Sequence, residues 1–380
     1  MCNTTRRHII KWFCLSVLLW ISVSCSKNAD VPDTDVSSEK MTLNVGLKLP
    51  TRATGNEYEA GETYENYIDI AAENYRIYFF DTDNKLIARF EPSGFIVSEG
   101  SDFRQYGLLG KVPAILADYK NFKIVVFANW PSGYDDTNLI PGTTTINDIC
   151  TAEWAQYDCL KDDGLDPDAG RLMPFYGVHE YAGVTFTAGQ ATILEEPITL
   201  LRAMAKVEVI LETDGELNLS FSELRINRYN AKGYCAPKDV FHQSGYDHNG
   251  SWTADYVHTL HLVNGMNDEE EKDFAFRFVR QWNEGEKIHT KWETYLPEYQ
   301  NIDMGDAYSC IKAKFDDIQA ESYTIFFAQY DGGQTDNSND IRLNIERNNI
   351  YRFTVTVRNN RLVVNVQQWK YAYDNEYTFD

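Results

Sequence analysis

The sequence lacks the motifs on which the common classes of enzyme depend. It has no G-x-S-x-G nucleophile elbow, no phosphate-binding P-loop and no dinucleotide-binding G-x-G-x-x-G. Carboxylates occur all along so acidic a chain, and no pair of them stands out as a general acid and base. We therefore expect no catalytic residues, no cofactor and no enzymatic activity.

Metal-binding patterns are also scarce. No C-x-x-C occurs, and the close pair of histidines, His258 and His261, would lie on opposite faces of a strand. Two acidic loops, 162–168 and 331–340, could attract calcium, but neither has the spacing of an EF-hand loop. Solvated loops are the favoured interpretation, and we expect no metal site.

Basic residues are few for a chain of this length. Lys and Arg number 35 against 57 Asp and Glu, so the formal net charge is −22. A charge of this sign repels the phosphates of nucleic acids and the head groups of anionic lipids. This excludes nucleic acid as a partner and favours a soluble body outside the cell.

The N-terminus has the pattern of an export signal. Arg6, Arg7 and Lys11 precede a short apolar stretch, whereas a transmembrane helix needs about 20 apolar residues. Small residues then lead to Cys25, in the pattern of a lipobox. We predict that residues 1–24 are a lipoprotein signal peptide and that Cys25 carries fatty acyl chains such as palmitate. An ordinary secretory signal with an incidental cysteine is the alternative.

Four further cysteines remain in the predicted mature chain: Cys150, Cys159, Cys235 and Cys310. Export permits disulfides, and Cys150 and Cys159 are close enough in sequence to pair across a short loop. The alternative is four buried thiols that act as small hydrophobic side chains. The sequence leaves both states open.

The body of the chain predicts antiparallel sheets. Its 24 Tyr, 20 Phe and 8 Trp favour strands. Residues 41–49 alternate between apolar and polar, and 75–80 and 122–128 are apolar on both faces and end at turn residues. Further strands are predicted at 201–211, 323–327, 351–357 and 362–366, the last two as a hairpin. This pattern predicts an all-β fold of sandwiches.

Helical signals are thin, and the best candidates are 146–160 and 268–278. The chain length favours two domains. A glycine-rich segment that ends at Glu195-Glu196-Pro197 suggests the boundary. We therefore expect one domain over 53–197 and a second over 198–380, after a tether and first strand at 25–52.

Two segments stand out at the ends of the predicted mature chain. The strand at 41–49 is followed by a polar loop that contains the Arg52-Ala53 bond, an accessible site for an arginine-specific protease. The segment 362–380 is extended and aromatic to its last residues. A cut at Arg52 would open a groove and unpaired strand edges that a strand from another chain could fill. The alternative is an ordinary first strand and an ordinary last strand, with Arg52 uncut.

Five segments, in order along almost the whole mature chain, resemble the Bacteroidales fimbrillins, the type V pilin superfamily. They are 75–81 (YRIYFFD), 125–131 (VVFANWP), 173–177 (MPFYG), 201–209 (LRAMAKVEV) and 347–355 (RNNIYRFTV). The lipobox and Thr51-Arg52-Ala53 also stand where that family places acylation and maturation.

The resemblance implies two transthyretin-like β-sandwiches in tandem, export as a lipoprotein to the outer membrane, and cell-surface fimbriae that support adhesion. It implies that an Arg-specific protease removes residues 25–52. Subunits, copies of this chain included, would then join through a donor strand that contains Leu362, Val364, Val366 and Trp369. A tip or anchor subunit that keeps its lipid shares the fold, and a surface glycan-binding lipoprotein is a further alternative.

Overall fold

The computed structural model describes residues 41–50, 67–69, 74–99, 103–130, 136–150, 152, 156–158, 172–214, 219–229, 232–237, 276–299, 301–302, 308–315, 323–329, 341–358 and 361–370. All of them belong to the compact unit Lys40–Asp380. The predicted lipidation site, Cys25, and the predicted cleavage site, Arg52 and Ala53, lie outside the described residues.

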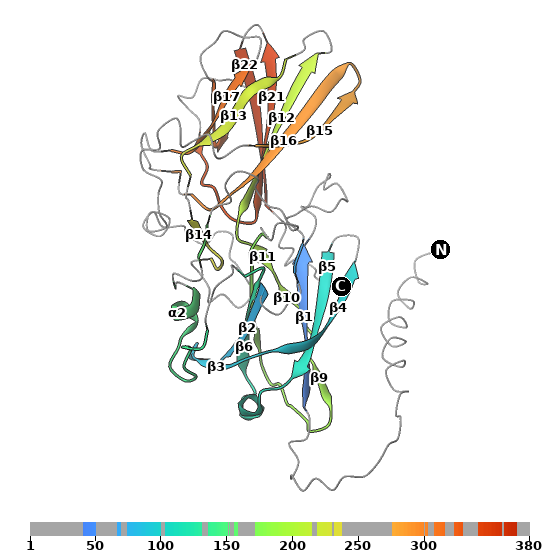
Figure 1. Ribbon diagram of the computed structural model, residues 1–380, viewed down its shortest axis with the longest axis vertical. Coiled ribbons are helices and arrows are strands. Elements are labelled where there is room, and N and C mark those ends of the chain that lie inside the picture. The colour runs from blue at the N-terminus through green and yellow to red at the C-terminus, as the bar shows by residue number, and fades with distance from the viewer. Residues whose placement is uncertain are drawn as a thin grey trace, which may run out of the picture. The chain divides into compact units, whose positions relative to one another are not determined.

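The first half of the chain forms two five-stranded sheets around one apolar core (Figure 1). The first sheet has the order β10-β1-β5-β4, and β9 also pairs with β1. Its strands are β1 (Thr42–Pro50), β4 (Pro92–Glu99), β5 (Phe103–Lys111), β9 (Ala191–Ile193) and β10 (Ile198–Thr199). The second sheet, β11-β8-β6-β2-β3, consists of β2 (Tyr75–Phe80), β3 (Leu86–Arg89), β6 (Phe122–Ala128), β8 (Phe175–Tyr181) and β11 (Leu201–Arg202). We call this pair of sheets the first sandwich.

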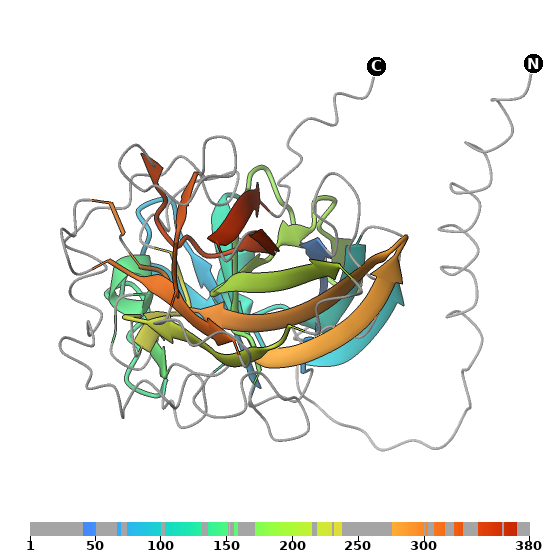
Figure 2. The ribbon, with the colours of Figure 1, turned by 90° about the horizontal axis from the view of Figure 1, so that it is seen from above.

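The second half forms a five-stranded third sheet and a three-stranded fourth sheet around a separate core. The third sheet, β15-β16-β12-β21-β22, consists of β12 (Ala205–Asp214), β15 (Arg277–Glu284), β16 (Lys287–Leu296), β21 (Asn349–Arg358) and β22 (Arg361–Lys370). The fourth contains β13 (Phe221–Asn227), β17 (Cys310–Phe315) and β18 (Tyr323–Phe326). We call this pair the second sandwich; the strong curvature of its β15–β16 hairpin is visible in Figure 2.

Smaller elements complete the described structure. Two short sheets pair β7 (Gln156–Asp158) with β14 (Lys232–Tyr234), and β19 (Ala328–Gln329) with β20 (Ile341–Arg342). The helical elements are α2 (Ile146–Cys150) and the 3-10 helix η3 (Ala114–Asp118). No helix among the described residues is both long and apolar enough to cross a membrane. The predicted all-β sandwich fold is confirmed.

The continuous apolar runs in the sequence became central strands, as predicted. All six residues of β2 and all seven of β6 are buried, which places both strands between covered faces. The turn after β2 also forms as expected, because Asp81 Oδ1 accepts hydrogen bonds from the backbone N–H groups of Asp83 and Lys85. The left-handed backbone of Asn84 (φ 61°) completes that turn.

The helix predicted over 146–160 forms at Ile146–Cys150, and the prediction was wrong at 156–158. Thr145 and Asp148 form a reciprocal capping box: Thr145 N–H donates to Asp148 Oδ2, and Asp148 N–H donates to Thr145 Oγ1. The helix ends after five residues, and Gln156–Asp158 is strand β7 instead. Tyr157 explains the change, because its hydroxyl donates to Ala203 O at 2.9 Å and its ring lies where a side chain at Gly233 would be.

The predicted helix over 268–278 was also wrong where it can be compared. Arg277 and Phe278 begin strand β15, which pairs with β16 through a hairpin at Gly285 (φ 62°). Residues 268–275 lie outside the described part of the chain. The apolar residues at 276 and 278 pack at the margin of a sheet, and sequence spacing alone did not distinguish that from one turn of helix.

Along the chain, the core of the first sandwich runs to Met204 and that of the second begins at Ala205, except that Cys235, Ala236 and Tyr295 also belong to the first core. The predicted boundary, at 197/198, lies a few residues earlier and remains a prediction. Strand β10 pairs with β1 and β11 pairs with β8, so residues 198–202 belong to sheets of the first sandwich.

Candidate functional site: the first strand and its groove

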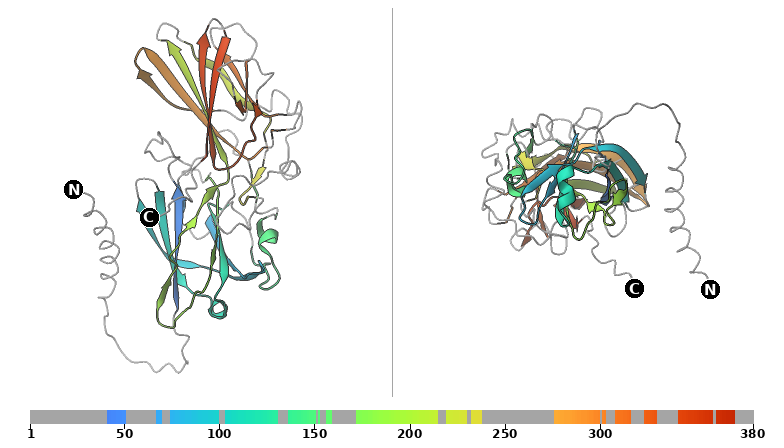
Figure 3. Two further views of the ribbon diagram at one scale, coloured as in Figure 1. Left: turned by 180° about the vertical axis from the view of Figure 1, so that it is seen from behind. Right: turned by 90° about the horizontal axis from the view of Figure 1, so that it is seen from below.

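Strand β1 lies inside the first sheet. It pairs antiparallel with β5 from Thr42↔Lys111 to Pro50↔Phe103, along its whole length. On its other edge it pairs parallel with β9 at Thr42–Asn44 and with β10 at Leu47–Lys48. Figure 3 (left) shows β1 beside β5 in this position. The sheet is therefore continuous only while β1, or another strand, occupies this place.

The alternation predicted for β1 is reproduced by its burial. Leu43, Val45 and Leu49 are 0% exposed and Leu47 is 4% exposed, and all four belong to the apolar core of the first sandwich. Burying one such side chain contributes about 1.5–3 kcal/mol, so the four together contribute roughly 6–12 kcal/mol. That is comparable with the whole stability of a typical domain, about 5–15 kcal/mol. The first sandwich therefore depends on a strand at this position.

Glycines let the walls around β1 come close. A Cβ at Gly46 would lie 3.2 Å from the Cβ of Pro197, in the connection between β9 and β10. A Cβ at Gly177 of β8 would lie 2.7 Å from Leu200 Cδ2 and 2.8 Å from Ile198 Cγ2. These two positions hold the β9–β10 segment against β1 on one side and against the second sheet on the other.

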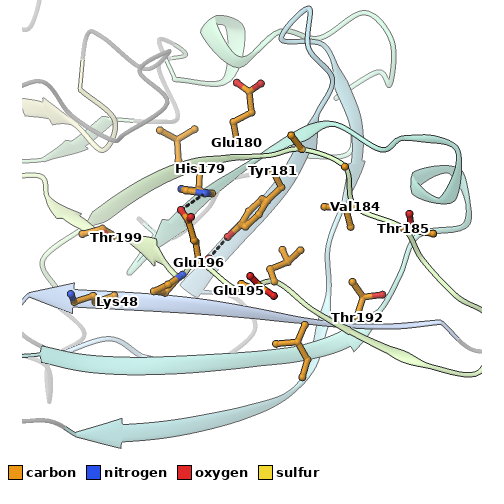
Figure 4. Close-up of a pocket in the computed structure, with 16 residues that line it drawn as sticks. Lys48, His179, Glu180, Tyr181, Val184, Thr185, Thr192, Glu195, Glu196 and Thr199 are labelled. Atoms are coloured by element: carbon orange, nitrogen blue, oxygen red, sulfur yellow. Dashed lines mark hydrogen bonds and ion pairs between the residues drawn. The ribbon is translucent and has the colours of Figure 1, made fainter. Parts of the chain in front are cut away.

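A groove of about 970 Å³ runs along the β9–β10 wall, between that wall and β8 (Figure 4). Lys48 of β1 lines it on one side, and His179 and Tyr181 of β8 line it on the other. His179 Nε2 lies 3.2 Å from Glu196 Oε2, and the Tyr181 hydroxyl donates to Glu196 O at 2.6 Å. Through these two contacts, Glu196 holds the β9–β10 segment, which flanks β1, against strand β8. We call this set of contacts the latch.

Burial sets the protonation of this latch. Desolvation lowers the pKa of His179, and the carboxylates of Glu196 and Glu180 offset that effect in part. Desolvation also raises the pKa of Tyr181, so the phenol keeps its proton and remains a donor to Glu196 O.

The predicted donor strand is β22, which forms the last strand of the third sheet. Leu362, Val364 and Val366 pair with Val357, Val355 and Phe353 of β21, as the predicted hairpin requires. Trp369 pairs with Ile350 and falls in the odd-numbered set of positions.

The cysteines, the histidine pair and the acidic loops were the other candidates from the sequence. Cys150, Cys235 and Cys310 are buried free thiols, and Cys159 lies outside the described residues. Desolvation raises the pKa of Cys150 and raises that of Cys235 to about 12, so both are inert thiols. The pair His258 and His261 and both acidic loops also lie outside the described residues. Within the described part of the chain, no group of three metal-binding side chains is present.

Sequence reasoning missed a buried ionic cluster at the centre of the third sheet. Glu208 of β12 lies 3.3 Å from Lys206 Nζ, 2.6 Å from Lys291 Nζ of β16 and 2.6 Å from Arg352 Nε of β21. Burial opposes its ionisation, but the three cations prevail and lower the pKa of Glu208 to about 2. The sequence predicted a strand over 201–211, and alternation of charged and apolar residues along a strand is typical of one buried and one solvated face. The signal available in the sequence was an acidic residue in the central strand, Glu208, with a basic residue in each of the two strands that flank it, Lys291 and Arg352.

A second buried ion pair was also missed. Arg347 Nη2 lies 2.6 Å from Glu298 Oε2, and both side chains are almost fully buried. The same guanidinium donates to the carbonyl oxygens of Cys235 and Tyr234. Arg347 opens the segment 347–355 that carries part of the resemblance to the fimbrillins, and its role is to hold the chain after β14 against the start of β21.

Comparison with known proteins adds evidence on the fold. The sequence matches no family model and no curated protein sequence. Among solved structures, the tip fimbrial protein Mfa3 from Porphyromonas gingivalis, with a C-terminal truncation, matches with a TM-score of 0.53 and 15% sequence identity. The match covers 87% of this chain and 99% of that chain. The chain has the fold of a fimbrial protein.

At 15% identity, this likeness concerns the fold. The predicted resemblance to the Bacteroidales fimbrillins is confirmed at that level. A Bacteroides uniformis structure, provisionally named a cell adhesion protein, matches with a TM-score of 0.42 and 10% identity, over 87% of this chain and 98% of that chain.

Proposed function

We propose that this protein is a structural subunit of cell-surface fimbriae, without catalytic activity, that polymerises by strand replacement at β1. It is exported as a lipoprotein acylated at Cys25 and held at the outer membrane until an Arg-specific protease cuts after Arg52. One observation carries the proposal: β1, a central and buried strand, ends at Pro50, two residues before Arg52. A cut at that bond leaves β1 attached only by non-covalent contacts.

The energetics of β1 imply that cleavage alone does not release it. Four buried side chains and two edges of backbone hydrogen bonds hold the strand, so the nicked chain keeps its fold. Release requires a competing strand that restores those contacts as β1 leaves. The lipid therefore serves to deliver the precursor, and polymerisation begins when a neighbouring subunit supplies the replacement.

The replacement is a C-terminal strand of another copy or of another fimbrial subunit. Strand β22 suits this role because it is the last strand of its sheet and pairs with β21 alone among the described strands. Leu362, Val364 and Val366 repeat at the spacing of Leu43, Val45 and Leu47 in β1. In that register the three side chains would take the core positions of Leu43, Val45 and Leu47, and Gln368 would stand at the position of Leu49.

Two variants test the mechanism. Arg52→Lys keeps the positive charge but removes the site for an Arg-specific protease, so the surface form should retain residues 25–52 and form no fibres. Deletion of residues 362–380 should leave processed monomers. Electron microscopy and the N-terminal sequence of the surface form report both outcomes. Fibres assembled from either variant would contradict the proposal.

A tip or anchor subunit is the second candidate, because the solved structure that matches with a TM-score of 0.53 is described as a tip fimbrial protein. A subunit of this kind keeps its own β1 or sits only at one end of the fibre. Antibody labelling separates the cases: labelling along the fibre supports a polymerising subunit, and labelling confined to one end supports a tip. Acylated Cys25 on the fibre-associated form supports an anchor.

A further inference from the structure

The outer face of the first sheet is apolar and exposed. Ile96 of β4, Leu109 of β5 and Ile193 of β9 are 59%, 40% and 53% exposed. The register brings them together, because Leu109 and Ile193 both pair with Asn44 of β1, and Ile96 pairs with Gly107 of β5. Residues on a strand alternate between faces, so these side chains lie on the side opposite the core. An apolar patch of this kind on an exported protein marks an interaction surface.

The same face has two adjacent glycines and a lysine towards each end. Gly46 of β1 and Gly107 of β5 stand side by side in the register and contribute no side chains of their own, while Pro197 and the Gln105 side chain come close to Gly46. The charged side chains described at face positions of these strands are Lys48 and Lys111, at opposite ends of the β1–β5 pair. Lys48 shares its groove with Glu180, Glu195 and Glu196, whereas Lys111 is exposed at the other end of the pair. A partner for this face should carry large apolar side chains and a carboxylate that can reach Lys111.

We propose that residues 371–380 of a neighbouring copy of this chain bind the outer face of the first sheet. The proposal rests on the function proposed above, in which a neighbour's β22 takes the place of β1. Strand β22 ends at Lys370, so the following residues would then start beside this face. Ten extended residues span about 33 Å, close to the roughly 30 Å of the nine-residue β1. The segment is long enough to run back along the whole sheet.

The sequence of that segment matches the face. Tyr371, Tyr373, Tyr377 and Phe379 all occupy odd positions, and Asp374, Glu376 and Asp380 all occupy even positions. In an extended chain the aromatic rings would therefore share one side and the carboxylates the other. The rings can cover Ile96, Leu109 and Ile193, and the carboxylates can reach Lys111 at one margin and Lys48 at the other.

A binding experiment tests the proposed contact on a truncated chain from which only residues 371–380 have been removed. A fluorescent peptide of sequence YAYDNEYTFD is titrated against this protein, whose first sheet is complete because its own β1 is present. The double variant Lys48→Glu/Lys111→Glu should weaken binding at least about tenfold, and Leu109→Asn should weaken it by a similar factor. Lys120→Glu makes a matched charge change at an exposed turn outside this sheet and should leave the affinity unchanged.

The outcomes separate this inference from the proposed function. Absence of peptide binding, or binding that neither face variant affects, overturns the inference. Fibres that still require residues 362–370 would leave the proposed function intact. Binding to the truncated chain but not to the intact monomer would place the tail on its own copy and overturn the assignment to a neighbour. In fibres, deletion of 371–380 alone should permit assembly but lower the temperature at which fibres dissociate. Unchanged thermal stability of those fibres would also contradict the inference.

Discussion

Strands β1 and β12 occupy corresponding places inside the first and third sheets, and they are held in different ways. β1 buries four aliphatic side chains on one face and presents Thr42, Asn44, Gly46 and Lys48 on the other. β12 is buried on both faces over Ala205–Leu211, and Glu208 ties it to a cation on each neighbouring strand. Aliphatic contacts are interchangeable between strands of like spacing, whereas a buried charge accepts few substitutes. Because of this difference, a strand from another subunit can replace β1, whereas β12 should stay in its sheet.

The largest expected loss of stability comes from removing the buried ion pairs of β12. Glu208→Gln keeps the side-chain shape but leaves Lys206, Lys291 and Arg352 without their shared carboxylate, so it should lower the free energy of unfolding by about 3–5 kcal/mol. Denaturant unfolding and hydrogen exchange of the β12 amides measure the loss. Glu212→Gln, on the same strand, removes a pair with the partly exposed Lys287 and should cost below about 1 kcal/mol. Equal losses in the two variants would refute the central role of Glu208.

A similar loss should follow from truncation in β1. Leu47→Ala removes most of a core side chain and should destabilise the first sandwich by about 2–5 kcal/mol. Hydrogen exchange should accelerate in the β1 and β5 amides and not in those of β12. Thr42→Ala, on the outer face of the same strand, serves as the control and should change little. If Leu47→Ala also speeds fibre growth after proteolysis, release of β1 limits assembly.

Lowering the pH should weaken the attachment of β12 but not that of β1, with a smaller effect than the substitutions above. The pKa of Glu208 falls from 4.5 to about 2 on folding, so the folded state binds its proton less readily than the unfolded state. The stability that this group adds, about 3 kcal/mol, is complete above pH 4.5 and is lost as the pH falls towards 2. β1 carries no carboxylate. Between pH 4.5 and 2, the β12 amides should lose protection in the parent chain, and Glu208→Gln should lack this dependence. Identical pH profiles for the two would contradict the assignment.

The smallest effect concerns the latch beside β1. Because burial lowers the pKa of His179, the folded state binds fewer protons than the unfolded state, and stability should decline as the pH falls through about 6.5. His179→Gln should remove that decline. Thermal unfolding at pH 7.5 and 5.5 measures it, and exchange of the β9–β10 amides shows whether the flank of β1 responds. A decline that persists in the variant would mean that other groups cause it.

Elements that depend on local sequence patterns were predicted, whereas elements that depend on contacts between residues distant in the sequence were not. β1, β2 and β6 were predicted because their burial follows from local patterns of apolar residues. Strand β7 was not, because Tyr157 is held by Ala203 and Gly233, far away in the sequence. Tertiary contacts of this kind override local helical preference.

The candidate site was predicted in part for the same reason. The alternation at 41–49 indicated a strand with one buried face, and that face is buried in the first core. The sequence did not show that β1 lies between β5 and β10, nor that Glu196 latches its flank to His179. The Glu208 cluster was missed because charged residues that alternate along a strand normally face water. Here they face one another across three strands.

The most direct test of strand replacement is mass spectrometry of fibres purified from the cell surface. Strand replacement predicts subunits that begin at Ala53, with no acylated Cys25 and no peptide from residues 41–49. Fibres in which every subunit retains residues 41–49 and the lipid on Cys25 would contradict it.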